Sequence, residues 1–263
     1  KIYSFVIDSG TGAVTPTTPA SQPTCTYPYG VEIDSANKYV YVACYNGAKI
    51  RWFTIDHSNG TLTYAGEISS ISNRKLAGVV TNPAGTMLYA GVFEASGYIQ
   101  AYSLDATGLP TPLGEYATGA SVSLLAIDPF DRFVFTADNG GGSVTKYKIK
   151  YSPVFSLSNS KTLTTSVASS PDGLFVHPNG AYLYTGSAAN PGYAFAFSIN
   201  GGTGDLTEID AKNLVVDSTG GSGIVTDATG SHLYTTALGA NRLYGFSIGS
   251  DGRLTSLSTP FWA

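Results

Sequence analysis

Charged residues are scarce in this 263-residue chain, where Lys, Arg, Asp and Glu together make up 12 % of the sequence. No run of Lys or Arg occurs and the formal net charge is −4, so nothing favours nucleic acid or an anionic membrane as a partner. No apolar stretch approaches the roughly 20 residues of a membrane-spanning helix, and we expect no membrane insertion. The hydrophobic share of 43 % excludes a disordered chain.

Motifs for cofactors and metals are missing as well. The sequence has no glycine-rich nucleotide loop that leads into a helix, no HExxH pattern and no calcium loop. Its three histidines, His57, His177 and His232, have no partner at the spacing of a metal site or a catalytic triad. The sequence therefore predicts neither a cofactor nor a metal.

What the sequence does have is one strand pattern that recurs every 45 to 50 residues. Its central aromatic residues are Phe5, Phe53, Tyr102, Tyr147, Phe197 and Phe246. A second pattern recurs at a similar interval, with Tyr41, Tyr89, Phe135, Tyr184 and Tyr234. Apolar and small or polar residues alternate with period two, which is typical of β-strands, and we expect these aromatic side chains to be buried. Clusters of Gly, Asn and Asp between the patterns supply the positive φ angles of tight turns.

Each complete repeat contains four predicted strands. In the first complete repeat these are residues 30–34, 39–44, 49–56 and 61–68. Four antiparallel strands per repeat are typical of a β-propeller blade, whose faces are buried by the neighbouring blades. Five repeats are complete and the N-terminal one has only its outer two strands, so the sequence predicts 22 strands. We expect an all-β propeller of six or seven blades, forming a single domain over residues 1–263. Either one blade is incomplete or preceding sequence has been removed.

The repeats resemble the YVTN-type propellers of the bacterial 6-phosphogluconolactonase and fungal carboxymuconate-cyclising lactonase family. Two motifs carry the resemblance, PxGxxLYxA at 82–90 and 177–184, and YxIDxxTGxLT at 50–63 and 243–255. The resemblance implies a site at one mouth of the central channel, built from a His, a Glu and several Arg residues. It also implies seven blades, in which case this chain is a fragment that lacks roughly one and a half repeats.

The family's site residues carry over only in part. Residues 138–143 read Asp-Asn-Gly-Gly-Gly-Ser where the family has Asp-Leu-Gly-x-Asp-Arg, and Ser121 and Ser123 stand near the position of its His. Glu94 is the only acidic residue in a loop equivalent to the family's Glu turn, and Arg242 keeps an arginine in the last repeat. Glu94, Arg242 and Asp138 are therefore the catalytic candidates, and we expect the family's catalysis to be lost or altered.

Ligand-binding residues are expected in the loops where inner strands begin and second strands end, because functional side chains of such scaffolds lie on loops. These loops contribute Tyr29, Arg74, Lys75, Asn139, Asp172 and Asn241. This mixture of charged and polar side chains is suited to binding an anionic or polyhydroxyl ligand. Polar loops at a channel rim are equally consistent with a surface that only faces solvent.

The chain has two cysteines, and the predicted hairpin brings them to the same end. Cys25 lies just before the inner strand and Cys44 ends the second strand, so their Cα atoms can approach the ~5.5 Å of a disulfide. A disulfide bridge would indicate an oxidising compartment. The alternative is two unrelated thiols, which would give no information about the compartment. Asn59 begins a glycosylation sequon. The chain starts at Lys1, as expected if a leader was removed or the chain was trimmed.

We therefore expect a secreted, monomeric glycoprotein of fungal type, extracellular or in a cell wall. The leading hypothesis is a lactonase-like propeller that binds a small polar molecule or glycan at the channel mouth without the family's catalysis. The first alternative is an active lactonase or lactonising cyclase that uses Glu94 and the rim arginines. The second is an adhesin or lectin-like module in which the loops of several blades bind together.

Overall fold

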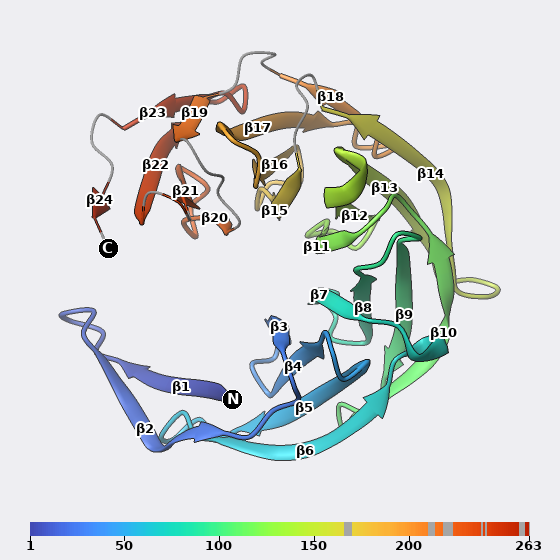
Figure 1. Ribbon diagram of the computed structural model, residues 1–263, viewed down its shortest axis with the longest axis vertical. Coiled ribbons are helices and arrows are strands. Elements are labelled where there is room, and N and C mark those ends of the chain that lie inside the picture. The colour runs from blue at the N-terminus through green and yellow to red at the C-terminus, as the bar shows by residue number, and fades with distance from the viewer. Residues whose placement is uncertain are drawn as a thin grey trace. The chain divides into compact units, whose positions relative to one another are not determined.

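The computed structural model describes residues 1–165, 170–209, 214–217, 223–237, 239, 241–257 and 261–262 (Figure 1). Within these residues the regular structure consists of antiparallel strands and two 3-10 turns, Ile71–Asn73 and Asn139–Gly141. None of the described segments forms a helix long and apolar enough to cross a bilayer. The chain divides into two compact units, residues 1–93 with 100–115, and residues 94–99 with 116–263.

The first unit starts with a two-stranded sheet and continues with a four-stranded one. The two-stranded sheet pairs β1 (Ile2–Ile7) with β2 (Val14–Gln22). The next sheet has the order β3 (Pro28–Ile33), β4 (Tyr39–Cys44), β5 (Lys49–Ile55) and β6 (Leu62–Ser69). A third sheet consists of β7 (Leu76–Thr81), β8 (Met87–Val92), β9 (Tyr98–Leu104) and β10 (Pro110–Ala117), and the boundary between the units crosses β9 and β10. The order in each four-stranded sheet is the order along the chain.

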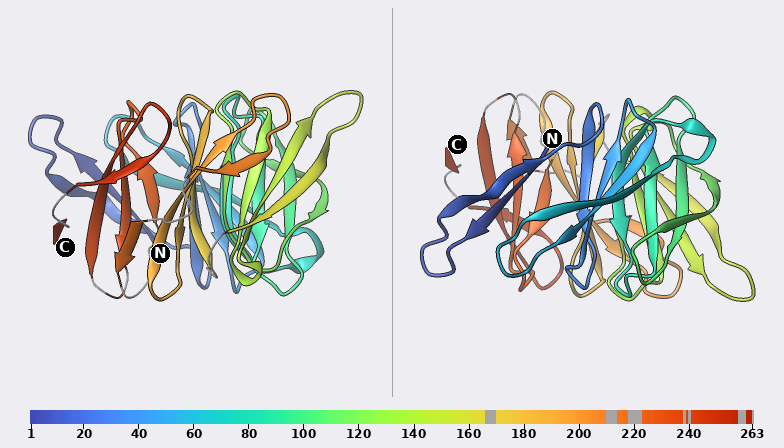
Figure 2. Two further views of the ribbon diagram at one scale, coloured as in Figure 1. Left: turned by 90° about the horizontal axis from the view of Figure 1, so that it is seen from above. Right: turned by 90° about the horizontal axis from the view of Figure 1, so that it is seen from below.

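The second unit contains three sheets of the same design. The first has β11 (Val122–Ile127), β12 (Phe133–Asp138), β13 (Ser143–Lys150) and β14 (Ser156–Thr164). The second has β15 (Pro171–Val176), β16 (Tyr182–Ser187), β17 (Gly192–Ile199), β18 (Leu206–Glu208) and β19 (Leu214–Asp217). The third has β20 (Ile224–Thr226), β21 (His232–Ala237), β22 (Arg242–Ile248), β23 (Leu254–Ser256) and β24 (Phe261–Trp262). Figure 2 shows the turn of the β13–β14 hairpin, in yellow-green, extending away from the rest of its sheet.

In each of the last two sheets, two short strands pair with the same third strand. Both β18 and β19 pair with β17, and both β23 and β24 pair with β22, so each pair occupies one outer position. Counted in this way, the described residues form one sheet with two strand positions and five sheets with four, 22 positions in all. This arrangement agrees with the four-stranded repeat and the 22 strands predicted from the sequence.

The repeated aromatic residues form the centre of the packing of the four-stranded sheets, whereas Phe5 of the two-stranded sheet is 51 % exposed, contrary to expectation. The third-strand residues Phe53, Tyr102, Tyr147, Phe197 and Phe246 are 0–3 % exposed. Among the second-strand residues, Tyr41, Tyr89, Phe135 and Tyr184 are fully buried, and Tyr234 is half-buried. In the second unit, Phe135 and Phe197 pack in one apolar cluster with Leu174 and Leu183. This cluster contains residues of two neighbouring sheets. Burial of such a ring contributes about 1.5–3 kcal/mol, which explains why the repeat keeps an aromatic residue there.

A polar residue closes each turn between an inner and a second strand. Asp34 Oδ1 accepts hydrogen bonds from the N–H groups of Lys38 and Tyr39, at 2.7 Å each. Asn82 and Asp227 make the same pair of contacts in their own turns. His177 stands at the equivalent position and accepts through Nδ1 from the Asn179 N–H at 3.1 Å. Its Nε2 lies 2.9 Å from the Gly230 carbonyl oxygen, so this histidine has a structural role in the turn.

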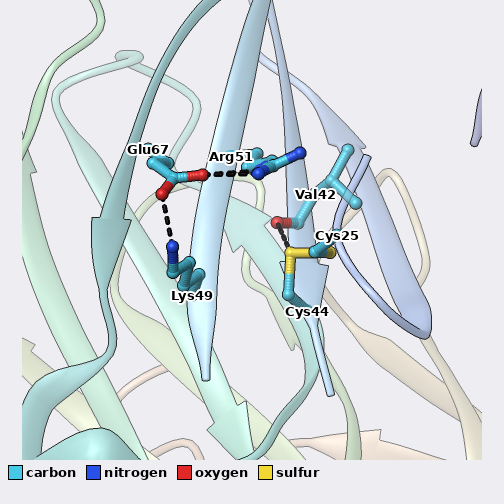
Figure 3. The surroundings of a disulfide bond; sticks show 6 residues. All are labelled: Cys25, Val42, Cys44, Lys49, Arg51 and Glu67. Carbon is cyan, nitrogen blue, oxygen red and sulfur yellow. Dashed lines mark hydrogen bonds and ion pairs between the residues drawn. A yellow bond between two sulfur atoms is a disulfide. The ribbon is translucent and has the colours of Figure 1, made fainter. Parts of the chain in front are cut away.

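The disulfide joins Cys25, in the segment before β3, to Cys44 at the end of β4, with a Cα–Cα distance of 5.8 Å (Figure 3). Cys44 is fully buried, so the bridge attaches the exposed segment around Cys25 to the interior of the sheet. Nearby, the Glu67 carboxylate of β6 accepts hydrogen bonds from Lys49 and Arg51 of β5. The bridge therefore fixes the loop that enters β3.

Removing the bridge should lower the free energy of unfolding by about 3 kcal/mol, because it closes a loop of 19 residues' separation that is free in the unfolded chain. The change is Cys25→Ala with Cys44→Ala, since alanine leaves no polar group in the buried Cys44 position. Urea unfolding followed by tryptophan fluorescence measures the difference, and the reduced wild-type protein is the control. Equal stability of the oxidised and reduced proteins would contradict the expectation.

Candidate functional site

Four aromatic side chains gather in the first unit where β3 begins and β4 and β8 end. Tyr27, Tyr29, Tyr45 and Phe93, with Asn46, line a hollow of about 290 Å³. Tyr27 is 64 % exposed and Tyr29 is 47 % exposed, which is unusual for large aromatic residues in a protein that buries most of its rings. This end of the sheets is the one that sequence reasoning selected for ligand binding. We call these four rings and Asn46 the aromatic hollow.

The rings of the aromatic hollow contact one another. Tyr45 lies at the centre, with ring centroids 6.2 Å from Tyr27, 6.4 Å from Tyr29 and 5.9 Å from Phe93. Tyr29 and Phe93 stack at 6.4 Å with an interplanar angle of 28°. These separations fall within the 4.5–7 Å range of favourable aromatic pairs. The mutual contacts hold the ring faces in place while leaving part of each one open to a ligand.

The backbone around the aromatic hollow is held by short-range contacts. The Tyr45 N–H donates to the Tyr27 carbonyl oxygen at 2.9 Å, beside the Cys25–Cys44 bridge. Tyr27 has φ 62°, a left-handed conformation that costs about 1 kcal/mol or more for a non-glycine residue. The hydrogen bond and the bridge maintain this conformation, which presents the Tyr27 ring at the surface.

Lys75 adds a positive charge to the same place. Its Nζ lies 5.3 Å from the centroid of the Tyr45 ring, a cation–π distance. The Phe93 N–H donates to the Lys75 carbonyl oxygen at 3.0 Å, so Lys75 and Phe93 are tied together at the ends of β7 and β8. Two of the predicted ligand-binding residues, Tyr29 and Lys75, therefore lie at one site.

Arg74, the neighbouring prediction, points into a polar network instead. Its Nε lies 3.1 Å from Glu115 Oε1, and the same oxygen accepts from Gln100 Nε2 at 2.8 Å. Gln100 is fully buried and also donates to the Ile71 carbonyl oxygen at 2.6 Å. Ser72, with φ 56° and ψ 21°, donates to Glu115 Oε2 at 3.1 Å. The network holds the strained turn before β7, and through it the position of Lys75.

Glu94 and Asn139 lie on loops that meet in the second unit. The Ser121 N–H donates to the Glu94 carbonyl oxygen at 2.8 Å, and the Asn139 N–H donates to the Ser121 carbonyl oxygen at 3.0 Å. Ser121, which the family resemblance placed near the family's His, thus joins two candidate residues through its backbone. Its φ of 56° is another left-handed conformation at this loop.

Asp138 ends β12 inside a cage of hydroxyl groups. Its carboxylate accepts from Thr136 at 2.9 Å, from Thr118 at 3.2 Å and from Thr145 at 2.5 Å, and its side chain is fully buried. Burial raises its pKa to about 6, although the hydrogen bonds from Thr145, Thr136, Thr118 and the Gly119 backbone act in the opposite direction. A pKa of this size suits proton transfer. The cage, however, separates the carboxyl group from solvent.

The remaining candidates lie on other sheets of the second unit. Asp172 is 9 % exposed on β15, and burial raises its pKa despite a hydrogen bond from Ser123. Asn241, with φ 51°, forms the turn before β22, and Arg242 is the half-buried first residue of that strand. Among the described residues no group of three or more His, Cys, Asp or Glu side chains could hold a metal ion.

Sequence reasoning identified only Tyr29 among the five residues of the aromatic hollow. Tyr27, Tyr45, Asn46 and Phe93 were not among its binding residues, although all four flank predicted strand ends. The available signal was that aromatic residues rarely occupy exposed loops, whereas three loops of this chain carry them at the same end of adjacent strands.

Replacing Asp138 with Asn should remove one pH-dependent loss of stability. The folded-state pKa of about 6 exceeds the unfolded value, so the folded protein binds the proton more tightly. The free energy of unfolding therefore falls as pH rises from about 4 to about 6, by about 3 kcal/mol in total for this group. Urea unfolding across this range should show a shallower decline for Asp138→Asn than for the wild type. Identical pH profiles for wild type and Asp138→Asn would contradict the expectation.

Comparisons with known proteins agree with this architecture. Residues 75–160 match the family described as "Lactonase, 7-bladed beta-propeller". A Bacteroides uniformis protein described as a 6-phosphogluconolactonase superposes with a TM-score of 0.81 at 17 % identity, over 98 % of this chain and 78 % of that one. The periplasmic gluconolactonase of Pseudomonas aeruginosa gives 0.79 at 15 % identity, with coverage of 98 % and 78 %. No curated protein matches the chain significantly in sequence.

The resemblance predicted from the repeats is thus confirmed, and the four-stranded antiparallel sheets are propeller blades. The fold is that of a β-propeller, and residues 75–160 are similar to the lactonase family.

Proposed function

We propose that this propeller binds a small polyhydroxyl ligand, of the size of one sugar unit, in the aromatic hollow. The single observation that supports this best is the exposed cluster of Tyr27, Tyr29, Tyr45 and Phe93 at the loop end of two neighbouring blades. The C–H face of a sugar ring packs on an aromatic face, and the phenol and amide groups at the edge can hydrogen-bond its hydroxyls. A volume of about 290 Å³ lies at the lower end of ligand pockets, which favours a compact ligand.

An aromatic cluster could also bind a quaternary ammonium ion, and Lys75 decides against that alternative. The Lys75 ammonium already lies over the Tyr45 ring, at the centre of the cluster. A cationic ligand would have to share the ring faces with a like charge, which removes most of the cation–π gain of about 0.5–2 kcal/mol. A neutral or acidic sugar would not be repelled by the Lys75 ammonium group.

The proposal places the protein in an oxidising, extracytoplasmic compartment. The Cys25–Cys44 bridge favours such a compartment, and one structural neighbour is described as periplasmic. Asn59, which begins the sequon, is exposed in the turn between β5 and β6. Intact-mass measurement before and after glycosidase treatment tests the glycan directly.

Ligand binding should depend on the rings of the hollow. With a panel of free hexoses and of uronic and aldonic acids, followed by saturation-transfer NMR, the wild type should bind at least one member. Tyr29→Ala and Tyr45→Ala should each raise its Kd about 3- to 10-fold, the loss of one aromatic contact of 0.5–1.5 kcal/mol. Tyr3→Ala, which removes a tyrosine that is 59 % exposed on β1, is the matched control. Binding that survives in all three variants would contradict the site.

Lys75→Met separates two ligand classes at this site. An acidic sugar should lose affinity in this variant, because the ammonium group that faces its carboxylate is gone. A neutral sugar should keep its affinity.

We further propose that the family's lactone chemistry is absent. Asp138, whose pKa burial raises to about 6, is enclosed by threonine hydroxyls, and Arg242 begins a strand of a different blade. Hydrolysis of 6-phosphogluconolactone and closure of carboxymuconate should therefore not exceed the uncatalysed rate in a spectrophotometric assay. A turnover that disappears in Glu94→Gln or Arg242→Ala would show that the protein is an active lactonase or cyclase.

A further inference from the structure

The turn of the β13–β14 hairpin departs from the turns at the same place in the other repeats. Four of those turns begin with an Asp or Asn side chain that accepts backbone N–H groups, namely Asp8, Asp56, Asp105 and Asn200. The equivalent residue here is Lys150, and residues 151–155 read Tyr-Ser-Pro-Val-Phe. This turn therefore lacks the Gly, Asn and Asp residues that close the others.

The replaced turn presents apolar side chains to solvent. Val154 is 74 % exposed and Tyr151 is 44 % exposed. Phe155 is half-buried, with its ring centroid 6.0 Å from Tyr151 and 6.1 Å from Tyr116. Figure 2 shows this turn extending away from its sheet. The ring contacts hold the turn in place and leave Val154 uncovered.

A second exposed apolar residue lies at the same end of this sheet. The β11–β12 and β13–β14 turns share that end, because β13 returns antiparallel to β12. Phe130 of the first turn is 59 % exposed, and the Tyr151 hydroxyl donates to Asp131 Oδ2 at 2.7 Å. The other repeats have small or polar residues at the position of Phe130, namely Ala36, Ala84, Asn179 and Thr229. We call Phe130, Tyr151 and Val154 the apolar tip.

The same hairpin concentrates positive charge in a chain whose formal net charge is −4. Residues 143–164 contain four lysines and no acidic residue. Lys146 and Lys161 share one carboxylate, that of Asp205, at 3.2 Å and 3.0 Å. Lys148 and Lys150 are exposed, and in the described part of the chain neither of them forms an ion pair.

These two exposed lysines stand close behind the apolar tip. Lys150 directly precedes Tyr151, and Lys148 lies on the same face of β13, about 7 Å further along the strand. The residues equivalent to Lys148 in the other third strands are uncharged, namely Val6, Thr54, Ser103, Ser198 and Ser247. Apolar and basic residues thus replace the usual residues of the repeat in one place. The net charge of the whole chain, which gave no reason to expect an anionic membrane as a partner, conceals this local pattern.

We propose that the apolar tip, together with Lys148 and Lys150, docks the protein peripherally on an anionic lipid surface. The tip residues enter the boundary between headgroups and acyl chains, where apolar side chains leave water. Interfacial segments reach about 5–10 Å into that boundary, so a tip at this depth brings both ammonium groups to the acidic headgroups. The docking needs no segment that spans the bilayer.

The shape and charge of the hairpin favour a lipid surface over other partners. A turn that extends from its sheet can enter a soft lipid boundary, whereas a sugar chain or a peptide needs a groove that encloses it (Figure 2). A second copy placed tip to tip would bring Lys148 and Lys150 against their own counterparts, and like charges repel.

Co-sedimentation of the full chain with vesicles tests the docking. One vesicle type is phosphatidylcholine alone, and the other contains about one-third phosphatidylserine. Binding to the anionic vesicles should be about 10-fold stronger or more, because each lysine near the surface contributes about 5-fold. Val154→Asp should weaken this binding about 10-fold, since the tip would then carry a charge into the apolar boundary. Val14→Asp, at a position 64 % exposed on β2, makes the same charge change elsewhere and should leave the binding unchanged.

The lysines are tested separately from the apolar tip. Lys148→Gln with Lys150→Gln should weaken binding to the anionic vesicles about 10-fold or more, and should not change binding to phosphatidylcholine alone. Lys1→Gln with Lys49→Gln removes the same charge from the first unit and is the matched control. The Gln and Asp substitutions of the hairpin are at exposed positions, so tryptophan fluorescence should show an unchanged fold.

Three results would overturn the proposal. The first is equal binding of the wild type to both vesicle types, or equal effects of each variant and its control. The second is retention on immobilised polygalacturonate without binding to anionic vesicles, which would show that the hairpin binds an acidic polysaccharide. The third is a dimer in light scattering that Val154→Asp converts to a monomer, which would show that a second copy covers the apolar tip.

Discussion

The burial of one sheet face against the next is the interaction on which the rest of this structure depends. A four-stranded sheet of this size cannot cover both of its own faces, so each blade is stable only where a neighbour covers it. The aromatic residue at the centre of the third strand is among the largest fully buried side chains, as at Phe53, Tyr102, Phe197 and Phe246. Gly30 shows how closely the sheets approach, because a Cβ atom there would lie 2.4 Å from the Ala77 carbonyl oxygen. The repeat therefore conserves size as well as hydrophobicity within the chain.

This packing leaves the loop ends of the blades as the place where sequence can vary. At the opposite end, the turn after each inner strand is closed by an Asp, Asn or His that accepts backbone N–H groups, and its residues serve the fold. The loops where inner strands begin and second strands end carry different side chains in different blades: aromatic rings at Tyr27 and Tyr45, and a hydroxyl cage around Asp138. The two sites are built on equivalent scaffolds but differ in chemistry.

The period of the sequence was sufficient to predict the strands, the blades and the residues at their centres, because burial imposes the same requirement on every repeat. The Cys25–Cys44 bridge followed from the hairpin alone. The site was harder to predict because loop conformations depend on local contacts. Arg74 faces Glu115 because of hydrogen bonds from Gln100 and Ser72, which no spacing rule contains. The Tyr27 ring is exposed because this residue has a left-handed backbone conformation, which could not be predicted from the sequence.

The position of the disulfide links two equilibria. The bridge holds the segment that carries Tyr27 and Tyr29, and the Tyr45 N–H closes the same loop. A molecule that prefers the arranged rings will bind the oxidised protein more tightly than the reduced one. Thermodynamic reciprocity then requires that the same molecule favour closure of the bridge by an equal factor. Occupancy of the rings and the thiol–disulfide balance of the surroundings are thus coupled through a single loop.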